Sequence, residues 1–324
     1  MELKQNLQQE NNSAKDKARG QKKQSLLAKR GVVILVALFC CLLWGSAFPA
    51  VASGYRLLNV NLEDPFQTAL FAGTRFMISA ILIFSYALMT GQSMKIDFQD
   101  FKKVAVLGLL QTFGQYFLFF LSLRTVHPAN GAILASLGVF FTVIIAHFVY
   151  KADRLTIKKS WGLVIGMSGI VILNGGAAGT FSLTGEGLMI ISMLLAALSG
   201  IYTKKLTTTI SPFVITGYQL LLGSTILISL GLVFAQDTAF TFTVISIPLL
   251  VHLGFISAAG FTLWSAILKY NDISKVSIYK FLIPIFGVFI SFLFHREPLD
   301  LIIVLISMTF VATGIILINL EKKN

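Results

Sequence analysis

The stretch GIVILN at residues 169–174 returns as GIILIN at residues 314–319. The repeat extends outward from this stretch, since residues 129–174 resemble residues 274–319. Both copies are strongly apolar, so both are expected to lie in a membrane. Two copies of an odd number of membrane spans must insert with opposite orientations, and many secondary transporters are built in this way.

The composition is that of a polytopic membrane protein. The chain has 324 residues, of which 56% are hydrophobic and 12% are charged, and its mean hydropathy is +0.81. A soluble domain carries about 25% charged residues. The net charge of +12 does not indicate a nucleic-acid partner, because the cations lie in a tail and in short loops. The two cysteines, Cys40 and Cys41, are adjacent in an apolar run and predict no disulfide framework.

Residues 1–31 form a segment of their own. Eight Lys and Arg residues stand against three acidic ones here, with too few apolar side chains to build a core. We expect a disordered, basic, cytoplasmic tail, which either binds anionic lipid or serves only as an orientation signal. No cleaved signal peptide is expected, because the apolar run that begins at Val32 is too long for one.

The apolar runs predict ten membrane spans, since a bilayer core takes about 17–25 apolar residues per helix. They lie at 32–54, 65–89, 103–123, 129–150, 159–176, 185–205, 212–235, 246–268, 275–295 and 299–320. With the N-terminus inside, 21 Lys and Arg residues lie on the cytoplasmic side and three on the other. This bias predicts a multi-pass protein of the cell membrane with both termini cytoplasmic. The predicted fold is an all-α membrane protein of ten transmembrane helices, arranged as two inverted five-helix repeats at 32–176 and 185–320.

Several motifs resemble those of a known family. Trp44-Gly45-Ser46 in the first span, Arg75 in the second, and FLIPIFG at 281–287 followed by Glu297 are similar to the EamA family of the drug/metabolite transporter superfamily. The resemblance covers nearly all of the chain after residue 31, as two EamA-like repeats. It implies a ten-helix inverted-repeat fold, a substrate cavity between the halves, and alternating access. Members of that family move small organic metabolites, often amino acids or amines.

The chain departs from the family pattern in three places. The fourth span reads Gly138-Val139-Phe140 where the family usually has a proline. The acidic motif after that span is weakened to Lys151-Ala152-Asp153, and the basic tail is longer than usual. The first departure bears on whether the fourth and ninth helices bend symmetrically.

Two cations remain inside the membrane after all others are assigned to loops and tails. Arg75 lies ten residues into the second span, about 15 Å deep, and Lys280 lies in the ninth span. Each charge costs several kcal/mol there, and every Asp and Glu falls in a tail, a loop or a helix end. We therefore expect Lys280 to bind a negative group of a substrate, and Arg75 is a candidate for the same role. Two alternatives stay open: a structural role for Arg75 and a snorkelling side chain for Lys280.

Two prolines predict hinges. Pro284 lies four residues after Lys280 and cannot donate a hydrogen bond to the carbonyl of that residue. Ser277, Lys280 and Pro284 share one helical face, which is expected to look into the bundle, and Ser277 joins the predicted substrate site. Pro49 is the second predicted hinge, in the first span.

Five further side chains are candidates for substrate binding: Trp44, Gln111, Gln115, Tyr116 and Gln219. Amides inside a membrane need partners, so interhelical hydrogen bonds are the ordinary alternative for the glutamines. Helix packing is the alternative for Trp44, which lies mid-span.

Other residues are expected to play structural parts. Trp161 and Trp264 are predicted to lie in the headgroup belt. His147 and His252 sit close to helix ends, and a ligand or proton role is not the favoured interpretation for either. A set of small residues in the fifth span predicts a seam for close helix contact: Gly162, Gly166 and Gly169.

The sequence thus favours a secondary transporter over an enzyme. The expected substrate is a small anionic or zwitterionic metabolite, such as an amino acid. No catalytic set, metal-ligand spacing, phosphate loop or cofactor motif stands out, and we expect a monomer or homodimer in the bilayer. The alternative is a membrane-embedded enzyme acting on a lipid-linked substrate, which needs clustered acid, His or nucleophile side chains near one surface. A channel or scaffold would not explain the inverted duplication.

Overall fold

The computed structural model describes residues 26–126, 128–176, 181–238, 240–295 and 300–320, and in them every regular element is a helix. The elements are α2 (Arg30–Leu57), α3 (Pro65–Thr90), α4 (Phe98–Leu107), η1 (Gly108–Gln115), α5 (Tyr116–Leu123), α6 (Pro128–Val149), α7 (Ile157–Leu173), η2 (Leu183–Gly187), α8 (Leu188–Leu206), α9 (Pro212–Phe234), α10 (Ser246–Tyr270), α11 (Ile273–Ser277), η3 (Ile278–Phe281), α12 (Leu282–His295) and α13 (Leu301–Asn319).

These elements form the ten predicted spans. In the described part of the chain, nine helical stretches are long and apolar enough to cross a membrane. The tenth is α7, whose 17 residues lie at the lower limit for a bilayer core. Three spans are composite: α4, η1 and α5 make the third, η2 and α8 the sixth, and α11, η3 and α12 the ninth.

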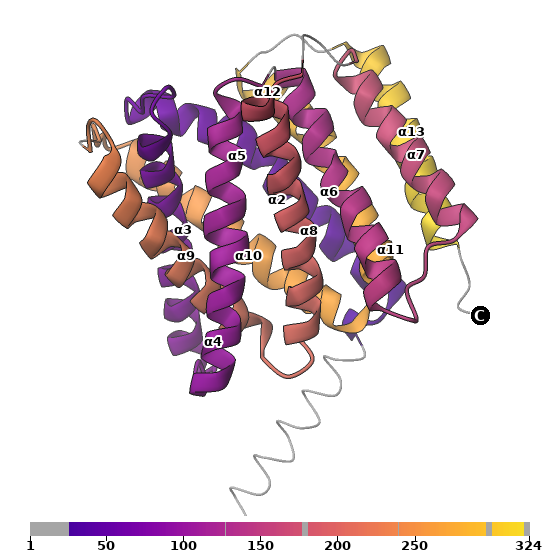
Figure 1. Cartoon of the computed structure of the whole chain (residues 1–324), viewed down its shortest axis with the longest axis horizontal. Helices are drawn as coiled ribbons and strands as arrows, with labels where there is room; N and C mark the ends of the chain where they lie inside the picture. Colours follow the sequence, from indigo (N-terminus) through magenta and orange to yellow (C-terminus); the bar gives the residue numbers. More distant parts are fainter. Residues whose placement is uncertain (1–25, 127, 177–180, 239, 296–299, 321–324) are drawn as a thin grey trace, which may run out of the picture.

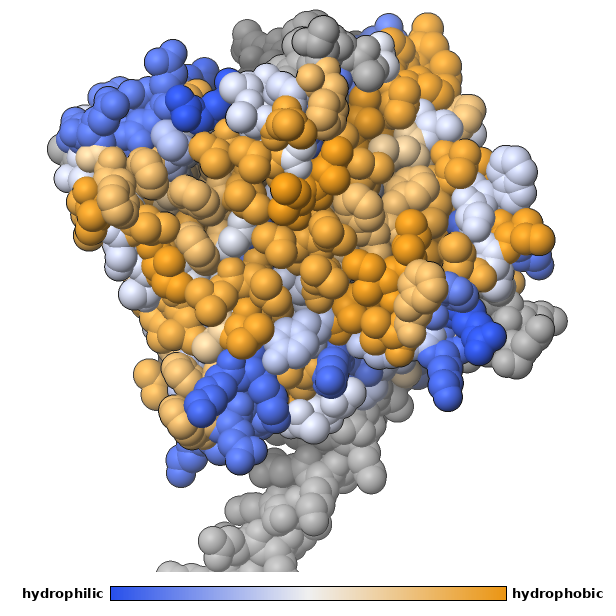
Figure 2. Space-filling model, in the orientation of Figure 1, coloured by the Kyte–Doolittle hydropathy of each residue, from blue (hydrophilic) through white to orange (hydrophobic). Residues whose placement is uncertain are grey.

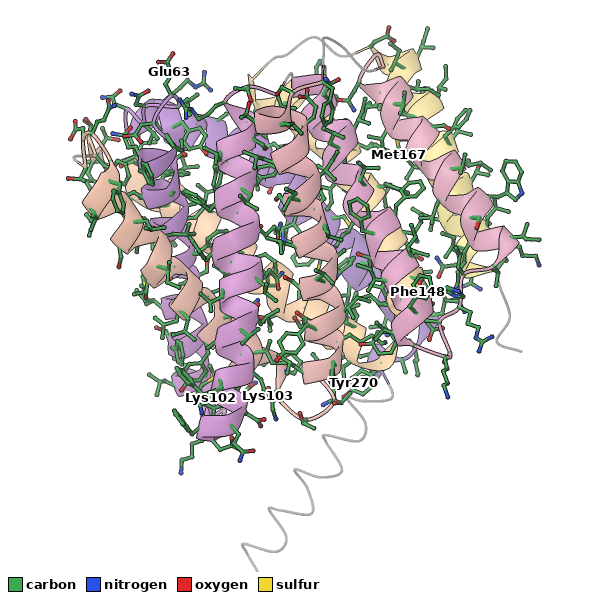
Figure 3. The ribbon with its side chains drawn as sticks, viewed as in Figure 1. Glu63, Lys102, Lys103, Phe148, Met167 and Tyr270 are labelled. Carbon is green, nitrogen blue, oxygen red and sulfur yellow. The ribbon has the colours of Figure 1, made fainter. Side chains whose placement is uncertain are left out.

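The chain enters and leaves the bundle on the same side. In Figure 1, α2 begins and α13 ends toward the lower side, as an even number of crossings requires. Figure 2 shows a broad apolar band between two polar rims. Lys102, Lys103 and Tyr270 lie at the lower rim and Glu63 at the upper one in Figure 3. We call the lower side the tail side and the upper side the far side.

The helices α7 and α13 show how the two halves are related. A Cβ atom added at Gly162 would lie 2.9 Å from the carbonyl oxygen of Gly314, and one added at Gly169 would lie 2.8 Å from that of Ser307. The repeats are offset by the 145 residues from Gly169 to Gly314. When each residue of one contact is replaced by its counterpart in the other repeat, the second contact results. This is what a two-fold axis between two antiparallel helices requires. The predicted glycine seam is therefore confirmed.

The other helices pack mostly on the opposite half. The first span, α2, lies against α10 and α12, and its counterpart α8 lies against η1, α5 and α6. The helices α3 and α9, which correspond to each other, pack together at the edge of the bundle opposite α7 and α13 (Figure 1). The predicted fold of two inverted five-helix repeats is thus confirmed.

The glycine seam gives a prediction about stability. Gly314→Ala would place its Cβ 2.5 Å from the carbonyl oxygen of Gly162, so we expect a loss of about 1–3 kcal/mol in the free energy of unfolding. Gly31→Ala is the matched control, because nothing lies within 4 Å of a Cβ there and alanine favours the helix. Thermal unfolding in detergent should separate the two; equal stabilities would contradict close packing of α7 on α13.

Candidate functional site

Lys280 lies at the break in the ninth span. The short helix α11 ends at Ser277, the 3₁₀ turn η3 covers residues 278–281, and α12 starts at Leu282. Pro284 falls in the first turn of α12, where the missing N–H of a proline has no intrahelical partner in any case. The carbonyl of Lys280 accepts instead from the N–H of Leu282. The break therefore precedes Pro284, whose role as a hinge stays a prediction.

The ammonium of Lys280 lies over two indole rings. Its Nζ is 5.1 Å from the ring centre of Trp264 on α10 and 5.8 Å from that of Trp44 on α2. The two indoles lie 5.1 Å apart at an interplanar angle of 56°. Trp264 is only 5% exposed, so its predicted place in the headgroup belt was wrong. Trp161, by contrast, is 60% exposed, as a belt residue should be.

Close backbone contacts hold these rings in place. A Cβ at Gly260 on α10 would lie 2.7 Å from Nε1 of Trp44, and a Cβ at Gly45 on α2 would lie 2.6 Å from Cβ of Phe286 on α12. The thiol of Cys41 donates to the carbonyl of Tyr279 over 3.2 Å. The first span is thereby fixed against both the eighth and the ninth, and Trp44 is aimed at Lys280.

Arg75 forms a second cationic centre. It is 6% exposed on α3, with its guanidinium carbon 4.5 Å from the ring centre of Phe76 and 5.6 Å from that of Tyr116. Its Nε has no hydrogen-bond partner among the described residues. The structure thus brings two predicted site residues together, Arg75 and Tyr116, and adds Phe76.

Neither Lys280 nor Arg75 forms an ion pair within the described residues. The ion pairs found there join Lys103 to Asp100, Lys159 to Asp153, and Lys275 to Asp272. Aromatic faces stabilise a desolvated cation by about 2 kcal/mol, which is less than the cost of burying it. Both centres can therefore gain from a negatively charged ligand.

The two centres are joined by aromatic side chains. Phe261 on α10 lies 5.8 Å from Trp44 and packs in the same apolar cluster as Phe76 and Tyr116. Phe261 was not predicted from the sequence, although its spacing of three residues from Trp264 places both on one helical face. Aromatic side chains thus lie beside both cationic centres.

The predicted glutamines lie on neighbouring elements. Gln219 on α9 is 1% exposed, and its backbone touches η1, where a Cβ at Gly108 would lie 2.9 Å from the carbonyl oxygen of Gln219. The side-chain oxygens of Gln219 and Gln111 are buried and have no partner in the described part of the structure. The backbone carbonyl of Gln115 accepts from the Ser192 hydroxyl over 2.7 Å. These unpartnered amide oxygens fit a polar ligand or water. The element η1 is a π-helix, and π-helical segments often occur at functional sites.

The remaining predicted residues are placed as follows. Ser277 is 1% exposed, one turn before Lys280, and the structure gives its hydroxyl no contact with the indoles. Pro49 lies inside α2, which continues through it. Nδ1 of His147 accepts from the N–H of Leu155 over 3.0 Å, which is a structural role, and His252 is exposed.

Comparisons with known proteins agree with the geometry. The family described as the EamA-like transporter family matches residues 31–175 and 183–320. Two Bacillus subtilis proteins, the "Uncharacterized transporter YvbV" and the "Uncharacterized transporter YyaM", are 26% identical over 309 residues (92% of this chain, 94% of theirs) and 27% identical over 267 residues (79% and 85%). An "Uncharacterized transporter" of Archaeoglobus fulgidus is 25% identical over 282 residues (86% and 93%). A solved structure, titled only "Crystal structure of protein", shares the fold, with a TM-score of 0.74, 19% identity and 89% and 96% of the chains covered.

Proposed function

Because this chain belongs to the EamA-like transporter family, we propose that it carries a small organic anion or zwitterion across the membrane by alternating access. One observation carries the choice of substrate class: the Lys280 ammonium lies over Trp44 and Trp264 without a carboxylate partner. A carboxylate or similar group of the substrate would supply the missing charge.

The second cation and the aromatic side chains refine the substrate class. Arg75 offers a second place for a negative group, and Phe261 packs near Trp44 and in the apolar cluster of Phe76. A ligand bound beside these rings meets aromatic faces, so an apolar body with a charged end fits. An amino acid fits as well, since its ammonium group can lie against an aromatic face.

Uptake into proteoliposomes tests the proposal directly. Purified protein should accumulate or exchange some labelled amino acids or organic acids, with and without a pH gradient, and should leave organic cations untouched. Empty liposomes and protein carrying Lys280→Met are the controls. Transport of organic cations in preference to anions or zwitterions would remove the proposed role of Lys280.

We further propose that the protein lies in the cytoplasmic membrane and that its tail side faces the cytoplasm. The positive-inside bias supports this orientation, and Figure 3 places Lys102 and Lys103 on the tail side and Glu63 on the far side. In intact cells, a membrane-impermeant maleimide should label Glu63→Cys and leave Lys102→Cys unlabelled. Both positions are exposed, so the reverse pattern would contradict the orientation and not the fold.

A further inference from the structure

An ion pair on the tail side is almost completely buried. Nζ of Lys159, in the first turn of α7, lies 2.7 Å from Oδ1 of Asp153, and the two side chains are 4% and 2% exposed. Lys159 also donates to the carbonyl of Arg154 over 2.6 Å.

The second oxygen of the Asp153 carboxylate reaches the other half of the molecule. Oδ2 accepts from the backbone N–H of Ser274, in the first turn of α11, over 2.9 Å. A hydrogen bond to a carboxylate is roughly twice as strong as one between neutral groups. Asp153 therefore joins the loop after α6 to the start of the broken ninth span.

Weaker contacts hold the same end of that span. The amide of Asn319 donates to the carbonyl of Lys275 over 3.4 Å, and the amide of Asn271 to that of Leu27 over 3.0 Å. The hydroxyl of Tyr150, directly after α6, donates to the carbonyl of Ile201 on α8 over 3.0 Å. The bonds to Ser274 and Lys275 thus tie α11 to the loop after α6 and to α13.

We infer that Asp153 and Lys159 are positioning residues that hold the tail-side end of the ninth span shut and thereby set the position of Lys280. Lys280 follows Ser274 by only six residues, through η3, so a movement of α11 also moves the ammonium of Lys280. The inference rests on the proposed alternating access, because opening on the tail side must separate Ser274 from Asp153.

Lys159 makes this contact reversible. A buried carboxylate that lost its partners would cost several kcal/mol. When α11 moves away, Asp153 keeps its ion pair with Lys159, and only the bond to Ser274 is lost. The pair therefore acts as a latch, in which the charge on Asp153 is neutralised in both the closed and the open state.

The experiment measures opening without any substrate. Ser277→Cys, at a position that is 1% exposed, reports opening through its labelling rate when a membrane-impermeant maleimide is added on the tail side. Asp153→Asn should raise this rate about tenfold or more, whereas Asp153→Glu should stay closer to the parent. The same variants without Ser277→Cys give the background from Cys40 and Cys41.

Asp100→Asn is the matched control. Its ion pair with Lys103 has the same 2.7 Å distance but is more exposed, since the Lys103 side chain is 49% and the Asp100 side chain 24% accessible. Loss of this pair should leave labelling unchanged. Unchanged labelling in folded Asp153→Asn protein, or an equal increase in Asp100→Asn, would overturn the inference.

Ser274→Pro keeps the inference testable if Asp153→Asn does not fold. Proline removes the N–H that Asp153 accepts, leaves the ion pair intact, and is tolerated in the first turn of a helix. Labelling should rise in this variant too, and an unchanged rate would count against the latch. Because no substrate is added, failure of Lys280→Met to affect transport would refute the proposed site and leave this result standing.

Discussion

Replacing Lys280 by methionine is expected to lower transport about a hundredfold or more while leaving the protein folded. Removing one partner of a desolvated charge pair costs about 2–5 kcal/mol, and here the other partner would be the substrate. The folded protein should become no less stable, because the lysine charge is half-buried over Trp44 and Trp264 without a carboxylate. Initial uptake rates and thermal unfolding of the same preparation measure the two effects.

Two further substitutions control this result. Lys280→Arg should retain part of the activity, because the charge survives while its shape changes. Lys102→Met makes the same chemical change at an exposed lysine, which lies over the ring of Phe98 at 4.4 Å, and should transport normally. Transport by Lys280→Met at the parental rate would show that the lysine reaches the surface and that the substrate needs no negative group.

Trp264 gives the second large effect. Trp264→Leu removes one of the two rings beside the ammonium, and we expect the half-saturation concentration to rise about tenfold, since a desolvated cation–π contact contributes up to about 2 kcal/mol. Trp264→Phe keeps an aromatic face and should lose much less. Trp161→Leu, at an exposed position, controls for the loss of an indole.

The comparison of the two Trp264 variants decides the cause of the loss. Both shrink a buried side chain, so both should lower the free energy of unfolding, by at most about 3–5 kcal/mol. Only the leucine variant removes the aromatic face. Equal increases in half-saturation concentration for leucine and phenylalanine would mean that Trp264 acts by filling space.

The fold could be predicted because the strongest physical constraint acts along the sequence. Each span must be apolar over the thickness of a bilayer, and the repeat from Gly169 to Gly314 relates the two halves. The seam of Gly162 and Gly169 was predictable for the same reason, since small residues at helical spacing mark close contact.

The site was predictable only in part, because neighbours from distant segments decide it. Lys280 and Arg75 stood out as charges inside a membrane. Trp264 looked like a belt residue by its distance from the helix end, but Trp44 and Lys280 meet it inside the bundle. The buried ion pair of Lys159 with Asp153 was not predicted, because Ser274, which bonds to Asp153, lies 121 residues further along the chain. No local pattern reports such contacts.

During synthesis, the first five spans enter the membrane before the helices on which they pack exist. Cys41 on α2 bonds to Tyr279, 238 residues further along the chain, and α7 packs on the last span, α13. The early helices therefore lack most of their partners until the second half arrives, and meanwhile each satisfies its own backbone hydrogen bonds in lipid. Assembly of this protein is for that reason a late event, completed only after the last helix has left the ribosome.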